Sequence, residues 1–203
     1  MLLSKLELNG FKSFPDKAEL RFDEGIMGVV GPNGCGKTNI LDSIRWVLGE
    51  QRSSLLRAGK VNEVIFNGTV QLRSADMAEV SLTIKNNRGV LPLEYDELVV
   101  TRRLYRSGES EYLLNKSRCR LKDITNLFAD TGMGIHAYSI FQQGMVDAVL
   151  SDKAEERRYL FEEAAGITKY KNRKKEALKK LDNTETDLVR LNDIIAEIAK
   201  NVR

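Results

Sequence analysis

The sequence predicts a mixed α/β domain followed by one long helix that begins a coiled coil. Three observations predict this architecture: strand-like alternation of apolar and polar residues, a glycine-rich loop between a strand and a helix, and a heptad repeat near the C-terminus. Hydrophobic residues make up 42% of the 203 residues, so the chain can bury the core of one ordinary domain with an appendage.

Apolar patterning locates the elements of the first domain. Ala18, Leu20 and Phe22 alternate with polar residues, which is typical of a half-buried strand. Residues 26–30 form a continuous apolar run, which predicts a buried strand directly before the glycine-rich loop. The remaining segments predict strands at 80–84 and 98–105, a hairpin over 112–121, and helices over 37–48 and 122–128.

The C-terminal segment carries apolar residues at heptad spacing. One row is Leu181, Leu188, Ile195 and Val202, and its companion row is Ala177, Leu191 and Ile198, with Thr184 as a weak member. This narrow seam predicts a coiled coil, and an amphipathic helix packed on the domain's own surface is the alternative. Because a coiled coil needs a second strand, we expect the chain to continue beyond Arg203 or to pair with another segment. We expect the first domain over residues 1–165 and the start of the coiled-coil arm over 166–203.

Composition argues against several classes of site. Cys35 and Cys119 are too few for a disulfide scaffold and lack metal-site spacing, and the single histidine, His136, argues against a histidine metal centre or a Ser-His-Asp triad. No run of about 18 apolar residues predicts a membrane span, and the charged first residues do not fit a signal peptide. We therefore expect a cytoplasmic protein. Its net charge of +3 does not by itself indicate nucleic-acid binding.

Residues 31–38 read Gly-Pro-Asn-Gly-Cys-Gly-Lys-Thr and fit the pattern G-x-x-x-x-G-K-[ST] at every fixed position. The glycines let successive backbone N–H groups point at phosphate oxygens, and the following helix N-terminus adds partial positive charge. Lys37 is expected to reach the β- and γ-phosphates of a nucleotide, and Thr38 to bind Mg²⁺. Residues predicted to hold the nucleotide from this stretch are Pro32, Asn33, Gly34, Cys35, Gly36, Lys37, Thr38 and Asn39.

An apolar strand ending in Asp or Asp-Glu, which such proteins use to hold Mg²⁺ and polarise water, is not found. The nearest candidate, residues 127–130, follows a helical pattern. The sequence therefore predicts nucleotide binding with little hydrolysis by this chain alone.

Five motifs together carry a family resemblance. They are residues 10–14 (Gly-Phe-Lys-Ser-Phe), 37–50 after the loop, 56–58 (Leu-Arg-Ala), 138–144 (Tyr-Ser-Ile-Phe-Gln-Gln-Gly) and 161–167 (Phe-Glu-Glu-Ala-Ala-Gly-Ile). In this order the chain resembles the N-terminal half-head of the structural maintenance of chromosomes (SMC) ATPases, particularly their bacterial chromosome-partition form. The resemblance implies an ABC-type P-loop ATPase half-domain with a mixed sheet, which binds ATP and Mg²⁺.

The resemblance also implies partners and an activity. In this family a C-terminal lobe of the same chain supplies the signature motif and the acidic strand, and two heads engage around two ATP molecules. A kleisin subunit binds at the neck, and DNA is held on the engaged heads without sequence specificity. The implied function is ATP-dependent organisation and segregation of the chromosome at the nucleoid. A DNA double-strand-break-repair ATPase of the same superfamily and a non-catalytic nucleotide-binding module are the alternatives.

The resemblance assigns further roles to individual residues. Gln143 matches the glutamine that reaches Mg²⁺ or the attacking water, with the adjacent Gln142 as an alternative. Arg57 is expected near the nucleotide and the head-engagement surface, and Lys12 and Ser13 where the first loop approaches the phosphates. Lys37 and Gln143 are thus the expected catalytic residues. The family usually has Ser in place of Cys35 and Thr38, but Thr38 keeps the hydroxyl.

Basic residues cluster between positions 102 and 122. This stretch contains seven basic residues and only two acidic ones, Glu109 and Glu111. The basic residues are Arg102, Arg103, Arg106, Lys116, Arg118, Arg120 and Lys122. On a strand Arg118 and Arg120 project from one face, with Lys122 in the same parity, which predicts a patch for DNA phosphates. Arg57 and Lys60 are expected to join it. A second basic run occupies residues 169–180, and ordinary solvated surface is the alternative for both.

Overall fold

A computed structural model describes residues 2–87, 95–129, 158 and 167–201. The chain divides into two compact units, Met1–Ile140 and Phe141–Arg203. The expected domain limit at 165/166 and the glutamine motif at 138–144 lie outside the described residues.

The described elements follow the predicted order. They are β1 (Leu2–Asn9), β2 (Ala18–Arg21), α1 (Lys37–Val47), the 3₁₀ turns η1 (Ser53–Leu56) and η2 (Val61–Val64), β3 (Met77–Lys85), β4 (Glu97–Tyr105), β5 (Ser110–Leu114), β6 (Ser117–Arg118), α2 (Leu121–Ala129) and α5 (Ile167–Asn201). The expected strands around 18–22, 80–84 and 98–105 and the helices around 37–48 and 122–128 are confirmed within a few residues.

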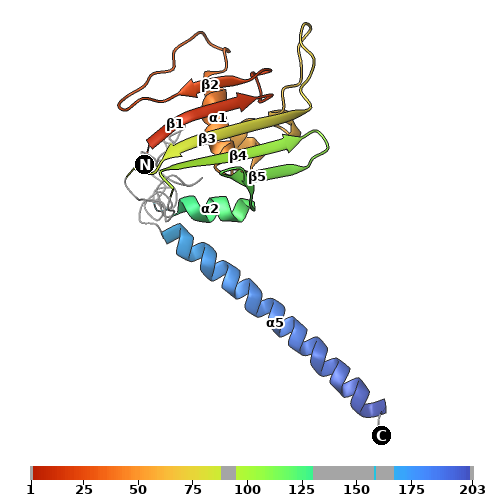
Figure 1. Cartoon of the computed structure of the whole chain (residues 1–203). Helices are drawn as coiled ribbons and strands as arrows, with labels where there is room; N and C mark the ends of the chain where they lie inside the picture. Colours follow the sequence, from red (N-terminus) through yellow and green to blue (C-terminus); the bar gives the residue numbers. More distant parts are fainter. Residues whose placement is uncertain (1, 88–94, 130–157, 159–166, 202–203) are drawn as a thin grey trace. The chain divides into compact units, whose positions relative to one another are not determined.

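The strands form one six-stranded sheet in the order β2-β1-β3-β4-β5-β6, and every described pair is antiparallel. Alternation buries one row of each strand, for example Leu6, Leu82 and Val100, which lie side by side in register. Helix α1 covers this face of the sheet (Figure 1), and its fully buried Trp46 packs on Phe11 with ring centroids 5.3 Å apart. The core therefore fixes how α1 lies on the sheet.

The predicted hairpin is formed by β5 and β6. Asn115 and Lys116 connect the strands and both have positive φ, 47° and 69°, as a two-residue type I′ turn requires. Asn115 tolerates this conformation, and its side-chain oxygen accepts a hydrogen bond of 2.8 Å from the backbone N–H of Val99. The turn is thereby fastened to β4.

Arg102 lies in the buried row of β4, between apolar neighbours, and is only 3% exposed. Its Nη1 donates to the carbonyls of Trp46 and Glu50, at 2.8 and 2.7 Å, and so reaches the C-terminal end of α1. The guanidinium lies 4.6 Å from the ring centroid of Trp46 and 5.2 Å from that of Tyr112. Burial lowers the pKa of Arg102 from its ordinary value. The prediction that Arg102 belongs to the basic surface cluster between residues 102 and 122 was therefore wrong.

The prediction of a buried strand over residues 26–30 was also wrong. These residues form no strand, and Ile26 and Val30 are almost fully exposed. A strand that is apolar on both faces needs neighbours to pair its backbone and cover its side chains. The described part of the chain pairs no strand with this segment, so the apolar run lies open to solvent.

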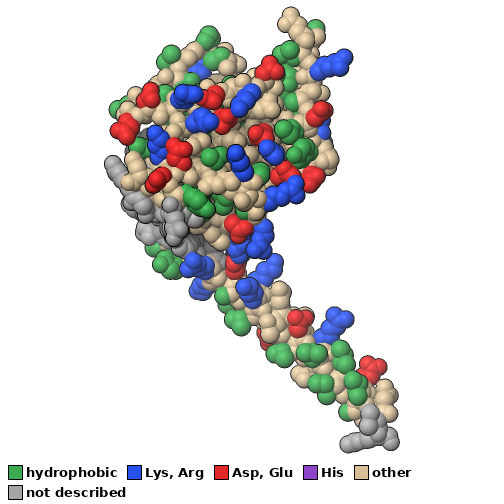
Figure 2. Space-filling model, viewed as in Figure 1, with side chains coloured by type: hydrophobic (Ala, Val, Ile, Leu, Met, Phe, Trp, Pro, Cys, Tyr) green, Lys and Arg blue, Asp and Glu red, His purple; other side chains and the backbone are tan. Residues whose placement is uncertain are grey.

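Helix α5 confirms the predicted C-terminal helix. Its heptad residues Leu181, Leu188 and Ile195 are all more than half exposed, and hydrophobic side chains recur along its length (Figure 2). Val202, the last member of the row, lies outside the described residues. Among the described helices, none combines the length and apolarity that a membrane crossing requires.

We predict that Arg102→Ala lowers the free energy of unfolding by about 3 kcal/mol, because two carbonyls lose their donor and the buried stacking is lost. Urea denaturation of the purified protein measures this loss. Arg103→Ala is the matched control, since Arg103 is partly exposed and pairs with Glu79 and Glu111. Its loss should stay within about 1 kcal/mol. Equal losses for the two variants would contradict the anchoring role of Arg102.

Candidate phosphate-binding site

The glycine-rich loop leads directly into α1. Gly34 and Gly36 have φ of +85° and +91°, which L side chains rarely adopt. Gly36 is the N-cap of α1 and provides no side-chain hydrogen bond to the first turn. The N-terminus of α1 is therefore without a side-chain cap, which suits an anion.

Two glycines of the loop also lie where a side chain does not fit. A Cβ on Gly36 would lie 2.5 Å from the hydroxyl oxygen of Ser13, and a Cβ on Gly31 would lie 2.9 Å from the sulfur of Cys35. The loop is thus curled closely on itself and against the segment between β1 and β2. This close approach explains why the pattern needs glycine at these positions.

The Lys37 side chain folds back onto the glycine-rich loop. Its Nζ donates to the carbonyl oxygens of Gly31 and Pro32, both at 2.6 Å, and lies 3.9 Å from the Cys35 sulfur. An ammonium group is thereby held over the turn whose backbone curls around it. Cys35 is exposed. Curled backbone, uncapped helix N-terminus and ammonium together fit a phosphate group.

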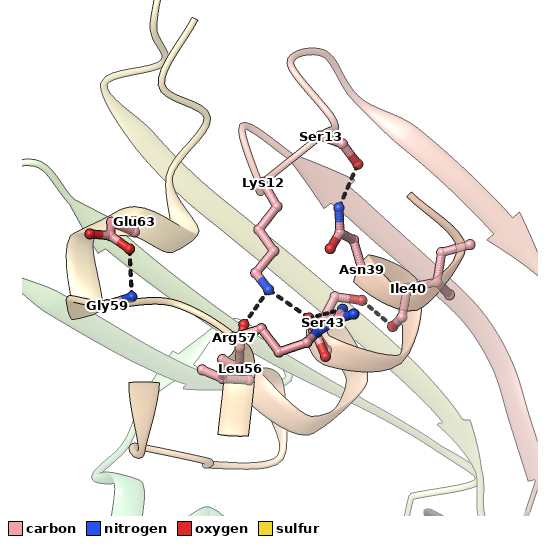
Figure 3. Close-up of polar contacts among 10 residues, drawn as sticks. Lys12, Ser13, Asn39, Ile40, Ser43, Leu56, Arg57, Gly59 and Glu63 are labelled. Carbon is pink, nitrogen blue, oxygen red and sulfur yellow. Dashed lines mark hydrogen bonds and ion pairs between the residues drawn. The ribbon is translucent and has the colours of Figure 1, made fainter. Parts of the chain in front are cut away.

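Ser13 and Asn39 join the first loop to α1. The amide nitrogen of Asn39 donates to the Ser13 hydroxyl at 2.8 Å, as Figure 3 shows. Ser13 thus touches the phosphate-type loop at both Gly36 and Asn39. Thr38 and Asn33 are exposed at the same end of the helix.

Lys12 and Arg57 meet on a carboxylate of α1. The Oδ2 atom of Asp42 accepts from Lys12 Nζ at 2.5 Å and from Arg57 Nη2 at 2.6 Å. Lys12 Nζ also donates to the Leu56 carbonyl. Figure 3 shows the two cations converging on α1 from opposite loops. The structure therefore brings Ser13 to the loop and Lys12 and Arg57 to Asp42 of α1, whereas Gln142 and Gln143 lie outside the described residues.

The predicted DNA patch is partly neutralised. Arg118 pairs with Glu111, which also faces Arg103 at 3.5 Å, and Arg103 pairs with Glu79. Acidic and basic side chains are interspersed over the visible face of the sheet (Figure 2). Alternating signs of this kind lower the net attraction for phosphates.

The shared strand face of Arg118 and Arg120 was a wrong expectation, because β6 ends at Arg118 and α2 begins at Leu121. The Arg120 side chain is 88% exposed and lies 3.7 Å from Asp123. Lys60 is exposed before η2. Arg106 donates to the carbonyls of Phe66 and Ala75. Lys60 and Arg120 are thus exposed on loops rather than on a strand, and Arg120 forms an exposed ion pair with Asp123.

Comparison with known proteins identifies the family. A model of the RecF/RecN/SMC N terminal domain matches residues 2–199. The chain belongs to this family. This match confirms the family resemblance that the five motifs predicted.

Relatives and solved structures agree with the family match. The chromosome partition protein Smc of Chlorobaculum tepidum is 57% identical over 203 residues, which are 100% of this chain and 17% of that protein. An SMC structure from work on ATP-driven dimerization and DNA-stimulated activation has a TM-score of 0.74 at 34% identity, covering 80% of this chain and 99% of that one.

The Smc head of Pyrococcus furiosus, with an extended coiled coil and bound to the C-terminal domain of ScpA, has a TM-score of 0.74 at 35% identity. The alignment covers 96% of this chain and 49% of that one. These likenesses confirm the predicted SMC head fold. The chain spans only 17% of the length of the curated relative above.

Sequence reasoning gave no role to Asp42, although it lies within a quoted motif. The residue is 1% exposed and holds two cations from distant segments. The signal that could have indicated its role is a single acidic residue on the buried face of the helix. A buried carboxylate needs a cationic partner, so such a residue predicts an ion pair.

For this SMC-family loop we predict that Gly36→Ala lowers the free energy of unfolding by about 2 kcal/mol or more, because a positive φ strains any Cβ. The Ser13 hydroxyl must also move away and give up its bond with Asn39. Gly28→Ala is the control, since a Cβ there meets nothing within 4 Å. Chemical denaturation of both variants measures the difference. A Gly36→Ala protein as stable as Gly28→Ala would contradict the close packing of the loop.

Proposed function

We propose that this chain is the ATP-binding N-terminal lobe of a bacterial SMC ATPase that organises and segregates chromosomal DNA. The single observation that carries the proposal is the loop at residues 31–38, where Lys37 lies over a curled backbone at the uncapped N-terminus of α1. Identity of 57% to a chromosome partition protein Smc supports the biological role. The proposed location is the cytoplasm, at the nucleoid.

In this proposal the loop holds the phosphates of ATP. Backbone N–H groups from Asn33 to Gly36 and the ammonium of Lys37 bind the oxygens, since they present positive ends to an anion. Ser13, Asn39 and Arg57 line the same side, and Thr38 offers its hydroxyl to Mg²⁺. The metal, when bound, neutralises charge on the phosphates during hydrolysis. Gln143 is proposed to orient the attacking water or reach the metal.

Hydrolysis is proposed to need residues from outside these 203. Among the described residues, no cluster of three or more metal-ligating side chains exists, and the sequence offers no acidic strand. A C-terminal lobe of the same protein is proposed to bring that strand, and the signature motif of a second head is proposed to complete the site. The lobe by itself is then nearly inactive.

The exposed apolar side chains at residues 26–30 support the proposal that a second lobe docks beside this segment. Apolar side chains such as Ile26 and Val30 lie open directly before the phosphate loop. Burying each of them is worth about 1.5–3 kcal/mol. A strand from the proposed C-terminal lobe beside this run would both cover it and fix the loop. Binding of ATP by two complete heads then favours their engagement, because ATP has higher affinity for the engaged state.

Helix α5 is proposed as the start of the coiled-coil arm. Its exposed heptad row, which includes Leu181, Leu188 and Ile195, needs a second strand to be buried. A returning coil of the same protein is the proposed partner, and a kleisin subunit is proposed to bind at this neck. The Smc head of Pyrococcus furiosus bound to ScpA supports a kleisin-type partner.

DNA is proposed to contact the exposed cations of the first unit. Lys60, Arg120 and Lys122 lie on loops or at the start of α2 and suit phosphates without base readout. Arg118 contributes less, because Glu111 neutralises it. Work on DNA-stimulated activation of SMC ATPases, from which one similar structure comes, supports this kind of ligand.

Lys37→Ala is expected to abolish ATP binding, because the loop loses the only ammonium that lies over its carbonyls among the described residues. Isothermal titration of the full-length protein with a non-hydrolysable ATP analogue measures the affinity. Arg21→Ala is the control, since Arg21 lies on β2 and pairs with the neighbouring Glu19. Mixing these 203 residues with the C-terminal lobe and measuring the molecular mass with and without ATP tests ATP-dependent dimerisation. Binding that survives Lys37→Ala would refute the proposed site.

Arg120→Glu combined with Lys122→Glu is expected to weaken binding of double-stranded DNA. The slope of log affinity against log salt should fall by about two, one for each lost phosphate contact. Fluorescence anisotropy over a salt series measures this slope. Lys17→Glu combined with Arg21→Glu makes the same charge change elsewhere and should leave the slope nearer its original value. An unchanged slope in the first variant would remove this patch from the DNA surface.

A further inference from the structure

Asp42 is a buried carboxylate that two cations share. Its side chain is 1% exposed, and one oxygen accepts from both Lys12 and Arg57. Asp42 lies one helical turn beyond Thr38, so the two side chains are on the same face of α1. The shared carboxylate therefore lies in the second turn of α1, close in sequence to the end of the phosphate loop.

The two cations are held unequally. The Lys12 side chain is 11% exposed and has a second acceptor in the Leu56 carbonyl. The Arg57 side chain is 51% exposed, and its guanidinium makes one hydrogen bond within the described part of the chain. Lys12 is thus fixed at the carboxylate, whereas Arg57 has little besides Asp42 to hold it.

Shared pairing has an energetic consequence. A buried carboxylate that loses its only counterion strongly destabilises the fold. With Lys12 in place, Asp42 keeps a counterion when Arg57 leaves, so the departure of Arg57 avoids most of this cost. Without Lys12, Arg57 would be the sole counterion and would be bound firmly to Asp42.

We propose that Asp42 is a positioning residue that holds Arg57 in reserve, and that Lys12 frees Arg57 to move onto a nucleotide phosphate. This inference rests on the proposed ATP-binding function. It assigns Lys12 a role through Asp42 rather than direct contact with the phosphates. Lys12 directly precedes Ser13, and Ser13 lies against Gly36 and Asn39. The Lys12–Asp42–Arg57 cluster is therefore connected to the phosphate loop through the backbone of this segment.

The test uses the affinity of the full-length protein for the ATP analogue AMP-PNP, measured by calorimetry. Lys12→Met should lower the affinity about tenfold or more, to the level of Arg57→Ala, because Asp42 then retains Arg57. Adding Asp42→Asn to Lys12→Met should restore the affinity to within about threefold, since the retaining charge is gone. Lys12→Arg should keep the affinity of the unsubstituted protein. Lys17→Met is the control, because Lys17 pairs with Glu7 instead.

Recovery of the affinity in the double variant is the decisive result, measured where urea denaturation shows every variant to be folded, because Lys12 and Asp42 are in contact and their effects on stability are coupled. A double variant no tighter than Lys12→Met would overturn the inference. If Lys12→Met fails to fold, Asp42→Asn alone decides: affinity at or above the original supports a reserve, and a fall to the Arg57→Ala level overturns it. Absence of AMP-PNP binding in the unsubstituted protein would overturn the proposed function and this inference with it, whereas a wrong order of affinities overturns this inference alone.

Discussion

Helix α1 is anchored by hydrogen bonds from cationic side chains, and the geometry of the phosphate loop depends on that attachment. Arg102 reaches from β4 to the carbonyls of Trp46 and Glu50 at the C-terminal end of the helix. Lys12 and Arg57 reach Asp42 in its middle. These contacts come from three separate segments of the chain. The N-terminal turn is thereby presented in a fixed direction without any cap of its own.

This division of contacts along one helix explains how the loop can stay polar and exposed in a stable domain. Aromatic and charged anchors hold the C-terminal half of α1, so the N-terminal half does not need to bury side chains. The loop is free to use glycines with positive φ, at Gly34 and Gly36, which destabilise it locally. A phosphate that binds there repays that local cost by pairing backbone groups that the fold leaves open.

The sequence predicted those features that depend on neighbours along the chain. Alternation located β3 and β4, the fixed glycines located the loop, and Asn115 with Lys116 marked the turn of the hairpin. It misjudged features that depend on distant partners. An apolar run at 26–30 resembles a strand whether or not a neighbour exists, and Arg102 resembles a surface cation until its row in β4 is known. The partners of Asp42 lie 30 and 15 residues away, beyond any local pattern.

The charged side chains around the phosphate loop relate the fold to the proposed chemistry. Around the loop the described residues supply cations from Lys37, Lys12 and Arg57, and Asp42 is the one buried carboxylate that pairs with them there. An excess of positive charge suits the binding of phosphates, whereas activating water and holding a metal require carboxylates that point into the site. Under the proposed function, the segment that binds phosphate is separate from the segments that cleave it. Hydrolysis in that proposal depends on assembly, because the lobe alone lacks the carboxylates that activate water.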